Sequence, residues 1–209
     1  MQSDFKELAS VDGTVTTTAE AMVPMKDDGL YRGDGAFEVI RLYGGRRIAA
    51  TEPLPAHGES LRLATVPYSP SVILNGVKSL SYGANMHATR IAQEGGADEA
   101  LLVRPDGIVL EAPTSTIFWV SPEGGLRTPA ISTGILESIT RGRIVQALHV
   151  EEAEFHIDDL HAAHEAFLAS TVREVQPIVE VDGRSFEGPG PRTLEAKEAF
   201  ERTVLEATT

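Results

Sequence analysis

Residues 107–120 read GIVLEAPTSTIFWV and decide the fold class of this chain. Two apolar runs, 107–112 and 115–120, are separated by Pro113 and Thr114, which favour a turn. Short apolar runs bounded by turn residues and rich in β-branched and aromatic side chains are typical of buried strands. The stretch therefore predicts two neighbouring strands in the interior of a sheet.

Strands and turns alternate on both sides of this stretch. The pair Asp12-Gly13 predicts a hairpin over 10–16, and Asp182-Gly183 predicts a second hairpin over 173–186. Prolines between 46 and 70 forbid a long helix there. Further strands are expected at 36–43, around 48, and at 61–66, 99–105, 126–130, 149–156 and 165–170.

Helical signals occur between these strands. Residues 76–96 are predicted to form a helix that begins at Lys78. The segment ends on two glycines, and its positions Ala84, His87, Ala88 and Ile91 have helical spacing. Ser138 is a suitable N-cap for a helix over 138–148. A short helix at 157–163 and an amphipathic closing helix at 193–207 complete a mixed α+β chain.

Composition excludes several classes of function. The 209 residues have 42% hydrophobic content and a net charge of −13, which repels nucleic acid and anionic membranes. The absence of cysteine excludes disulfides, thiolate nucleophiles and iron–sulfur clusters. The first residues have no signal-peptide pattern, so we expect a cytoplasmic protein. His161 and His164 lack metal-ligand spacing with a suitable carboxylate and are expected on a solvated face, so no metal site is predicted.

Lys78 differs from the other three lysines of the chain. Lys6, Lys26 and Lys197 have charged neighbours, whereas Lys78 follows the apolar run 72–77, VILNGV. Apolar surroundings lower the pKa of a lysine, and a neutral amine can form a Schiff base with an aldehyde. The alternative is a lysine at a strand end whose ammonium group reaches solvent.

Three further positions could belong to a ligand site. Residues 138–140 lie at a predicted helix start, where free N–H groups favour a phosphate, although an ordinary cap explains them equally well. Ser170 and Thr171 follow an apolar strand and could contact a second phosphate oxygen or merely shape a turn. Glu111 lies between apolar runs and needs a partner, either a pyridinium nitrogen or an arginine.

The order of these segments resembles the class IV, or fold-type IV, aminotransferases, a family that includes branched-chain and D-amino-acid aminotransferases and aminodeoxychorismate lyases. The matching stretches are 27–45, 64–92, 107–120, 128–141 and 168–177. The resemblance implies a trimmed N-terminal α+β domain over 1–66 and a larger β-barrel-like domain with helices over 67–209. It also implies pyridoxal 5′-phosphate as cofactor and a homodimer.

Individual residue roles follow from the resemblance. Lys78 would form the Schiff base and act as general acid and base, and Tyr82 would contact the phenolic oxygen of the cofactor. Glu111 would keep the pyridine nitrogen protonated. Leu136 would pack on the ring. Phosphate contacts would come from Ile139, Thr140, Ser170 and Thr171.

Substrate contacts and one departure also follow from the resemblance. Phe37 and Arg41 would line the substrate pocket, and the Thr171 and Val172 amides would lie near the substrate carboxylate. Between residues 45 and 64 the family normally has several dozen more residues, including a His-x-x-Arg-Leu helix whose arginine binds the phosphate. Arg46 or Arg47 could replace that arginine.

The resemblance leaves three functions open. Transamination between an amino acid, branched-chain or similar, and a 2-oxo acid is favoured because the strand FEVIRLY, 37–43, looks most like the aminotransferases. An aminodeoxychorismate lyase would use the same lysine and release pyruvate and 4-aminobenzoate. A shortened homologue that binds little or no cofactor is the non-enzymatic alternative.

Overall fold

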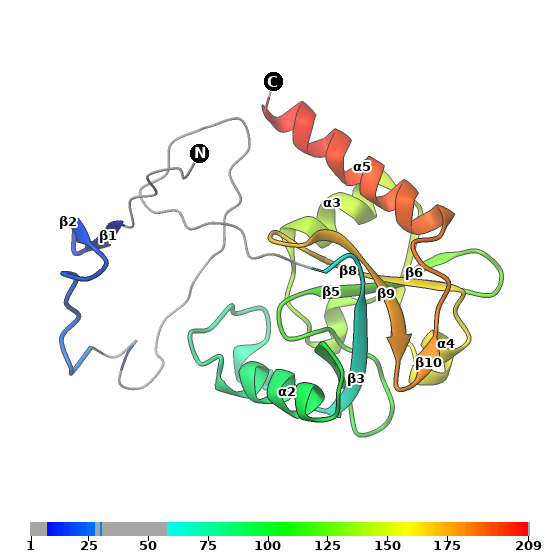
Figure 1. Cartoon of the computed structure of the whole chain (residues 1–209), viewed down its shortest axis with the longest axis horizontal. Helices are drawn as coiled ribbons and strands as arrows, with labels where there is room; N and C mark the ends of the chain where they lie inside the picture. The colour runs from blue at the N-terminus through cyan, green and yellow to red at the C-terminus, as the bar shows by residue number, and fades with distance from the viewer. Residues whose placement is uncertain (1–7, 28–29, 31–57, 209) are drawn as a thin grey trace.

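A computed structural model describes residues 8–27, residue 30 and residues 58–208 (Figure 1). It begins with a hairpin formed by β1 (Leu8–Val11) and β2 (Thr14–Thr17). Asp12 and Gly13 at its turn have φ angles of 50° and 81°, which Asp and Gly tolerate in tight hairpin turns. The predicted hairpin is confirmed, whereas the strands expected at 36–43 and around 48 lie outside the described residues.

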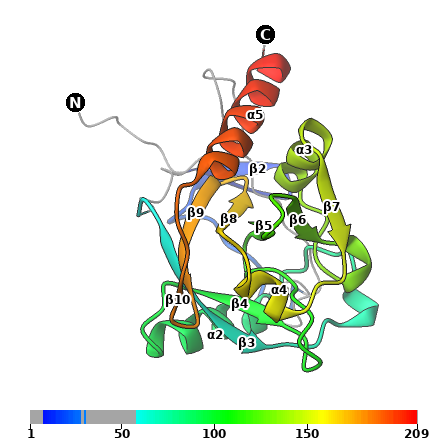
Figure 2. The same cartoon turned by 90° about the vertical axis from the view of Figure 1, so that its right-hand side faces the viewer.

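Eight strands form one mixed sheet that curls partly around itself (Figure 2). Their order is β4-β3-β9-β8-β5-β6-β7, with β10 beside β9. β3 pairs in parallel with β4 and β9, and β6 pairs in parallel with β7, whereas the other neighbours are antiparallel. The strands are β3 (Leu61–Pro67), β4 (Glu99–Val103), β5 (Thr116–Val120), β6 (Leu126–Pro129), β7 (Val150–Ala153), β8 (Glu165–Ser170), β9 (Glu174–Val181) and β10 (Arg184–Ser185).

Both faces of the central strand β5 are buried. Ile117 and Trp119 pack into a cluster on one face of the sheet, and Phe118 and Val120 pack into a second cluster on the other. The ring of Phe118 stacks on that of Phe167 with centroids 5.0 Å apart. Burial on both faces explains why this run is continuously apolar instead of alternating.

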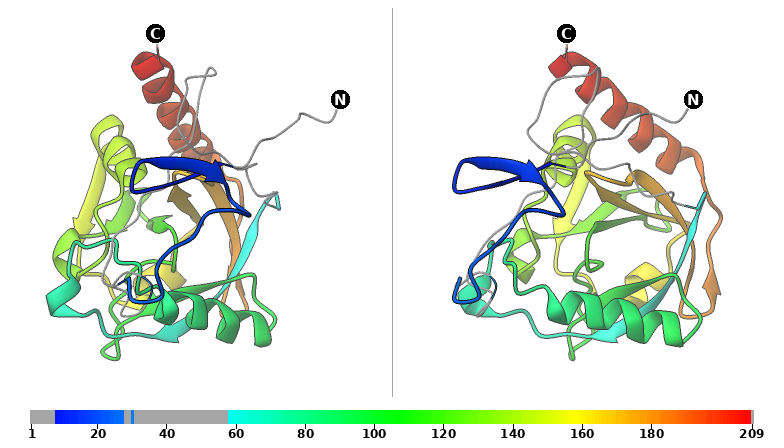
Figure 3. Two further views of the ribbon diagram at one scale, coloured as in Figure 1. Left: turned by 90° about the vertical axis from the view of Figure 1, so that its left-hand side faces the viewer. Right: turned by 60° about the vertical axis from the view of Figure 1, so that its left-hand side comes forward.

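The helices cover the sheet from different sides (Figures 1 and 3). α3 (Ile139–Ala147) packs against α5 (Pro191–Thr208), and both cover the Phe118 face. α2 (Gly83–Glu94) packs against β3 and β4 on the opposite side of the molecule. α4 (Ile157–His161) connects β7 to β8, and the short 3-10 helices η1 (Val72–Leu74) and η2 (Ile131–Thr133) lie between a strand and the helix that follows it. The mixed α+β architecture with a barrel-like sheet is confirmed.

The prediction that a helix begins at Lys78 is wrong, because α2 begins at Gly83. Tyr82 and Asn85 both donate hydrogen bonds to the carbonyl of Pro113 and thereby fix the first turn of the helix. The buried face of α2 is made by Ala88 and Ala92, and Ile91 is 43% exposed. The residues between η1 and Tyr82 therefore form a loop.

The predicted strand over 107–112 is also wrong, because this segment forms only isolated β-bridges. Its backbone changes partner along the chain: the amide of Val109 donates to Phe155, and that of Leu110 donates to Leu102. No single neighbouring strand therefore runs beside it for long enough to form a regular ladder.

The division of the chain at residues 66 and 67 stays a proposal, and β3 crosses that position. Among the residues that the structure describes, no helix is both long and apolar enough to span a bilayer.

Candidate active site

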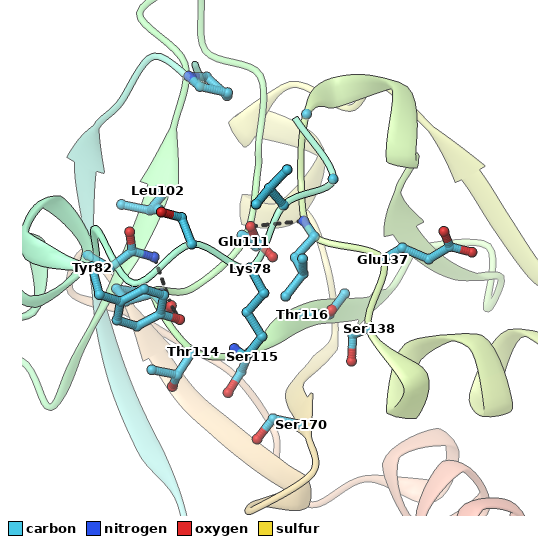
Figure 4. A pocket seen from close by; sticks show the side chains of 18 of the residues that line it. Lys78, Tyr82, Leu102, Glu111, Thr114, Ser115, Thr116, Glu137, Ser138 and Ser170 are labelled. Carbon is cyan, nitrogen blue, oxygen red and sulfur yellow. Dashed lines mark hydrogen bonds between the residues drawn. The ribbon is translucent and has the colours of Figure 1, made fainter. Parts of the chain in front are cut away.

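A pocket of about 550 Å³ opens where four connecting segments meet (Figure 4). The segments are 68–82, 111–116, 134–139 and 170–173. They follow or precede strands and helices of the larger sheet, so the rigid elements fix the ends of each segment. The volume is within the range of roughly 300–1,000 Å³ that small-molecule sites have.

Most of the residues expected at a ligand site lie around this pocket. Those that line it are Lys78, Tyr82, Glu111, Leu136, Ile139, Ser170, Thr171 and Val172. Thr140 is buried and follows Ile139 in α3 without lining the pocket. Phe37 and Arg41, with Arg46 and Arg47, lie outside the described residues. Sequence reasoning thus identified side chains that the fold brings together, while their roles stay predictions.

Lys78 lies in the loop between η1 and α2. Its side chain is partly buried, and its Nζ atom lies 5.5 Å from the centroid of the Tyr82 ring. The apolar run before it does not bury it, because Val72 and Ile73 are each 90% exposed. The run 72–77 therefore does not supply apolar surroundings for Lys78. Within the pocket its Nζ atom lies over the Tyr82 ring, and its charge acts on Glu111.

Glu111 is the most strongly perturbed acid of the pocket. Its Oε1 atom accepts a hydrogen bond of 3.1 Å from the amide of Leu136. Burial raises the pKa of Glu111 to about 7, although the Leu136 amide and the charges of Lys78 and Arg141 oppose the increase. In the ligand-free chain Glu111 is thus paired with a backbone amide, with the cations Lys78 and Arg141 nearby, instead of directly with an arginine. A cationic ligand beside Glu111 would favour its ionised form.

The raised pKa of Glu111 predicts a pH-dependent stability of the ligand-free protein. Between its ordinary pKa near 4.5 and about 7, the folded state binds a proton that the unfolded state has lost. Folding stability should therefore fall as pH rises through this window, by on the order of 3 kcal/mol. Urea unfolding at several pH values should show this decrease in the wild type and not in Glu111→Gln. Parallel curves for the two proteins would contradict the assignment.

Tyr82 is a neutral hydrogen-bonding group at physiological pH. Burial raises the pKa of Tyr82 to about 12, with the charges of Glu111 and Glu99 adding to the effect. Its hydroxyl donates to the carbonyl of Pro113. To donate a hydrogen bond to a cofactor oxygen, this hydroxyl would have to leave the Pro113 carbonyl, whereas it can accept one without leaving.

Polar groups gather at the start of α3 and in the turn 170–173. Ser138 caps α3, and its hydroxyl accepts a hydrogen bond from the amide of Arg141, as predicted for a helix start at this residue. The first N–H groups of a helix have no acceptor within the helix and favour an anion. Ser170 accepts a hydrogen bond of 3.2 Å from the amide of Arg173, which closes the turn.

The structure also contains a buried ion pair that sequence reasoning missed. Arg173 lines the pocket and lies 2.9 Å from Glu99, whose side chain is only 6% exposed. Arg173 also donates to Gln176, and Glu99 accepts from Thr89. The pair joins the turn 170–173 to α2 and β4. The sequence does place the carboxylate of Glu99 directly before the apolar run ALLV, which indicates a buried acid. It does not indicate which cation pairs with that acid.

Residues 47–181, about two thirds of the chain, match the family described as amino-transferase class IV. This range contains Lys78, Glu111 and the segments that surround the pocket.

Individual proteins of known sequence or structure are similar as well. The chain is 34% identical over 139 residues to D-alanine aminotransferase of Bacillus licheniformis, covering 63% of this chain and 48% of that protein. It is 35% identical over 139 residues, with the same two shares, to a putative branched-chain-amino-acid aminotransferase of Methanocaldococcus jannaschii.

A solved structure shares the architecture. It is the branched-chain amino acid aminotransferase of Thermobaculum terrenum in its pyridoxal-phosphate form, with a TM-score of 0.64 and 33% identity over 69% of this chain and 51% of that one. The chain thus spans about half the length of the proteins it matches.

Proposed function

This chain belongs to the amino-transferase class IV family, and from that premise we propose that it binds pyridoxal 5′-phosphate and transfers amino groups between an amino acid and a 2-oxo acid. The observation that carries the proposal is that Lys78 and Glu111 line one pocket, where burial raises the pKa of the carboxyl to about 7. Such a cofactor requires an amine that binds its aldehyde and a carboxyl that pairs with its cationic ring nitrogen.

The side chains present fit the cofactor. The Lys78 amine can hold its aldehyde, and Glu111 can accept the cationic ring nitrogen that would relieve the cost of its burial. The start of α3, beside Ile139, has N–H groups that suit a phosphate. The turn that contains Ser170 and Thr171 lines the same pocket and adds two hydroxyl groups.

When bound, the cofactor supplies an electron-withdrawing ring to the α-carbon of the amino acid. Glu111 would keep the ring nitrogen protonated. The Nζ atom of Lys78 would take the α-proton of the substrate and give a proton back as general acid and base. Tyr82 would orient the loop that carries Lys78.

For the substrate, we favour a branched-chain or similar amino acid as the donor. Relatives named as branched-chain and as D-alanine aminotransferases support an amino acid of modest size. The amides of Thr171 and Val172 would bind its carboxylate, and Phe37 and Arg41 would line its side-chain pocket. The stereochemistry of the donor is an outcome of the test below.

The test is a half-reaction with the purified chain and added pyridoxal phosphate. L-leucine, L-valine and D-alanine are supplied separately, and pyridoxamine phosphate and the 2-oxo acid are quantified by chromatography. Stoichiometric formation of both with one donor would support transamination. Release of pyruvate from aminodeoxychorismate without added 2-oxo acid would instead favour a lyase, and no absorption change with pyridoxal phosphate would favour a non-catalytic homologue.

The proposal extends to assembly and location. We expect a cytoplasmic homodimer, and the exposed apolar side chains of Val72, Ile73 and Val77 beside the pocket support self-association. Light scattering should give twice the chain mass for the wild type and a smaller mass for Ile73→Glu. A wild-type monomer would contradict the dimer without affecting the assignment of Lys78.

A further inference from the structure

The hydroxyl of Thr116 is buried in the pocket without an internal partner. Thr116 is the first residue of β5, is 1% exposed and lines the pocket. Its Oγ1 atom has no hydrogen-bond partner among the residues that the structure describes. Leaving a buried hydroxyl unsatisfied costs about 1–3 kcal/mol, so a ligand that accepts its hydrogen would recover this energy.

Another threonine of the same sheet shows the ordinary arrangement. Thr128 of β6 is also fully buried, and its hydroxyl donates to the carbonyl of Ile117 at 2.8 Å. Thr128 does not line the pocket. Of these two buried threonines on neighbouring strands, Thr116 lines the pocket with an unsatisfied hydroxyl, whereas Thr128 lies outside the pocket with a satisfied one.

The strand geometry directs Thr116 toward one end of the pocket. Side chains alternate along a strand, so Thr116 shares the face of Phe118, which α3 and α5 cover. Across the ladder Thr116 pairs with Ala169, and the turn with Ser170 follows at once. Figure 4 shows Thr116 and Ser138 on the same side of Lys78. Thr116 thus lies beside the turn 170–173 and lines the same pocket as the start of α3.

A phosphate suits this position, because it is both an anion and a hydrogen-bond acceptor. The start of α3 favours an anion, and the hydroxyl of Ser138 already accepts a bond from the amide of Arg141. A phosphate has several acceptor oxygens, so one oxygen can accept hydrogen bonds from the helix amides while another accepts one from the Thr116 hydroxyl. We propose that the Thr116 hydroxyl donates a hydrogen bond to the phosphate of the bound cofactor, an inference that rests on the proposed function.

The test is Thr116→Val, which keeps the side-chain shape and removes the hydroxyl. Pyridoxal phosphate and pyridoxal, which lacks the phosphate, are titrated by absorbance against the ligand-free full chain. We expect the variant to bind pyridoxal phosphate about 10- to 100-fold more weakly, with unchanged affinity for pyridoxal. Thermal unfolding of the ligand-free variant should occur at the wild-type temperature or above it, because an unsatisfied hydroxyl is lost.

Thr128→Val is the matched control. It removes a hydroxyl that the protein itself satisfies, so it should lower the unfolding temperature and leave both affinities unchanged. A second arm uses inorganic phosphate alone, whose stabilising effect on the ligand-free chain should weaken in Thr116→Val and persist in Thr128→Val. This arm needs no aldehyde chemistry at Lys78.

Each outcome decides the proposal. Unchanged affinity of Thr116→Val for pyridoxal phosphate would overturn it, as would an equal loss for pyridoxal, or a loss confined to the amino-acid substrate. If the wild type forms no adduct with pyridoxal phosphate, the proposed function fails. The experiment with inorganic phosphate then still tests the role of Thr116. If phosphate stabilises the wild type and Thr116→Val equally, the assignment of Thr116 is overturned independently of the proposed function.

Discussion

Replacing Lys78 with alanine should abolish transamination and prevent the covalent attachment of pyridoxal phosphate. Lys78 is the lysine that lines the pocket, with its Nζ atom 5.5 Å from the Tyr82 ring centroid. Because it would serve both as the attachment point and as general acid and base, we expect kcat to fall by at least about 10⁴-fold. Borohydride reduction followed by peptide mapping should place the adduct on Lys78 in the wild type and detect none in Lys78→Ala.

Lys197→Ala is the control for this substitution. Lys197 is exposed on α5, and its loss should leave the adduct, the absorption spectrum and the turnover unchanged. Recovery of the reduced cofactor on any other lysine of the wild type, or substantial turnover by Lys78→Ala, would refute the role of Lys78. Circular dichroism of both variants separates a loss of chemistry from a loss of folding.

Local sequence patterns predicted the parts of the fold that local physics determines. The pair Asp12-Gly13 marked the first hairpin because its left-handed backbone angles suit these two residues. Ser138 marked the start of α3 because its hydroxyl accepts a backbone hydrogen bond. The run 115–120 marked a buried strand because it is packed on both faces. The first two signals lie within a few residues of their structural cause, whereas the third is local in sequence although distant residues bury it.

The errors have long-range causes. Lys78 was assigned to a helix start, whereas Tyr82 and its hydrogen bond to distant Pro113 determine where α2 begins. The pair Glu99 and Arg173 joins residues 74 positions apart, and no local pattern relates them. The residues of the candidate site were predicted better than the contacts that hold them in place. The family resemblance indicated the site residues, whereas contacts such as that between Tyr82 and Pro113 depend on the folded structure.

Replacing Glu111 with glutamine should sharply reduce turnover while the cofactor still binds. The carboxyl is buried with a pKa raised to about 7 and accepts a hydrogen bond from the amide of Leu136, so a cationic ring nitrogen would favour the ionised form. A neutral amide cannot hold that proton in place, and the ring would withdraw electrons less strongly. We expect kcat to fall by about 10²–10³-fold, with a much smaller change in cofactor affinity, by analogy with the loss of one charge-stabilising group.

Glu137→Gln is the matched control, because Glu137 also lines the pocket but is exposed to solvent. The same chemical change there should leave kcat nearly unaltered, since an exposed carboxylate is well solvated and screened. The absorption spectrum provides a readout separate from turnover, because loss of the ring proton should shift the band of the bound cofactor in Glu111→Gln alone. Equal effects of the two substitutions would show that negative charge at the pocket, and not a carboxyl at the ring nitrogen, supports the reaction.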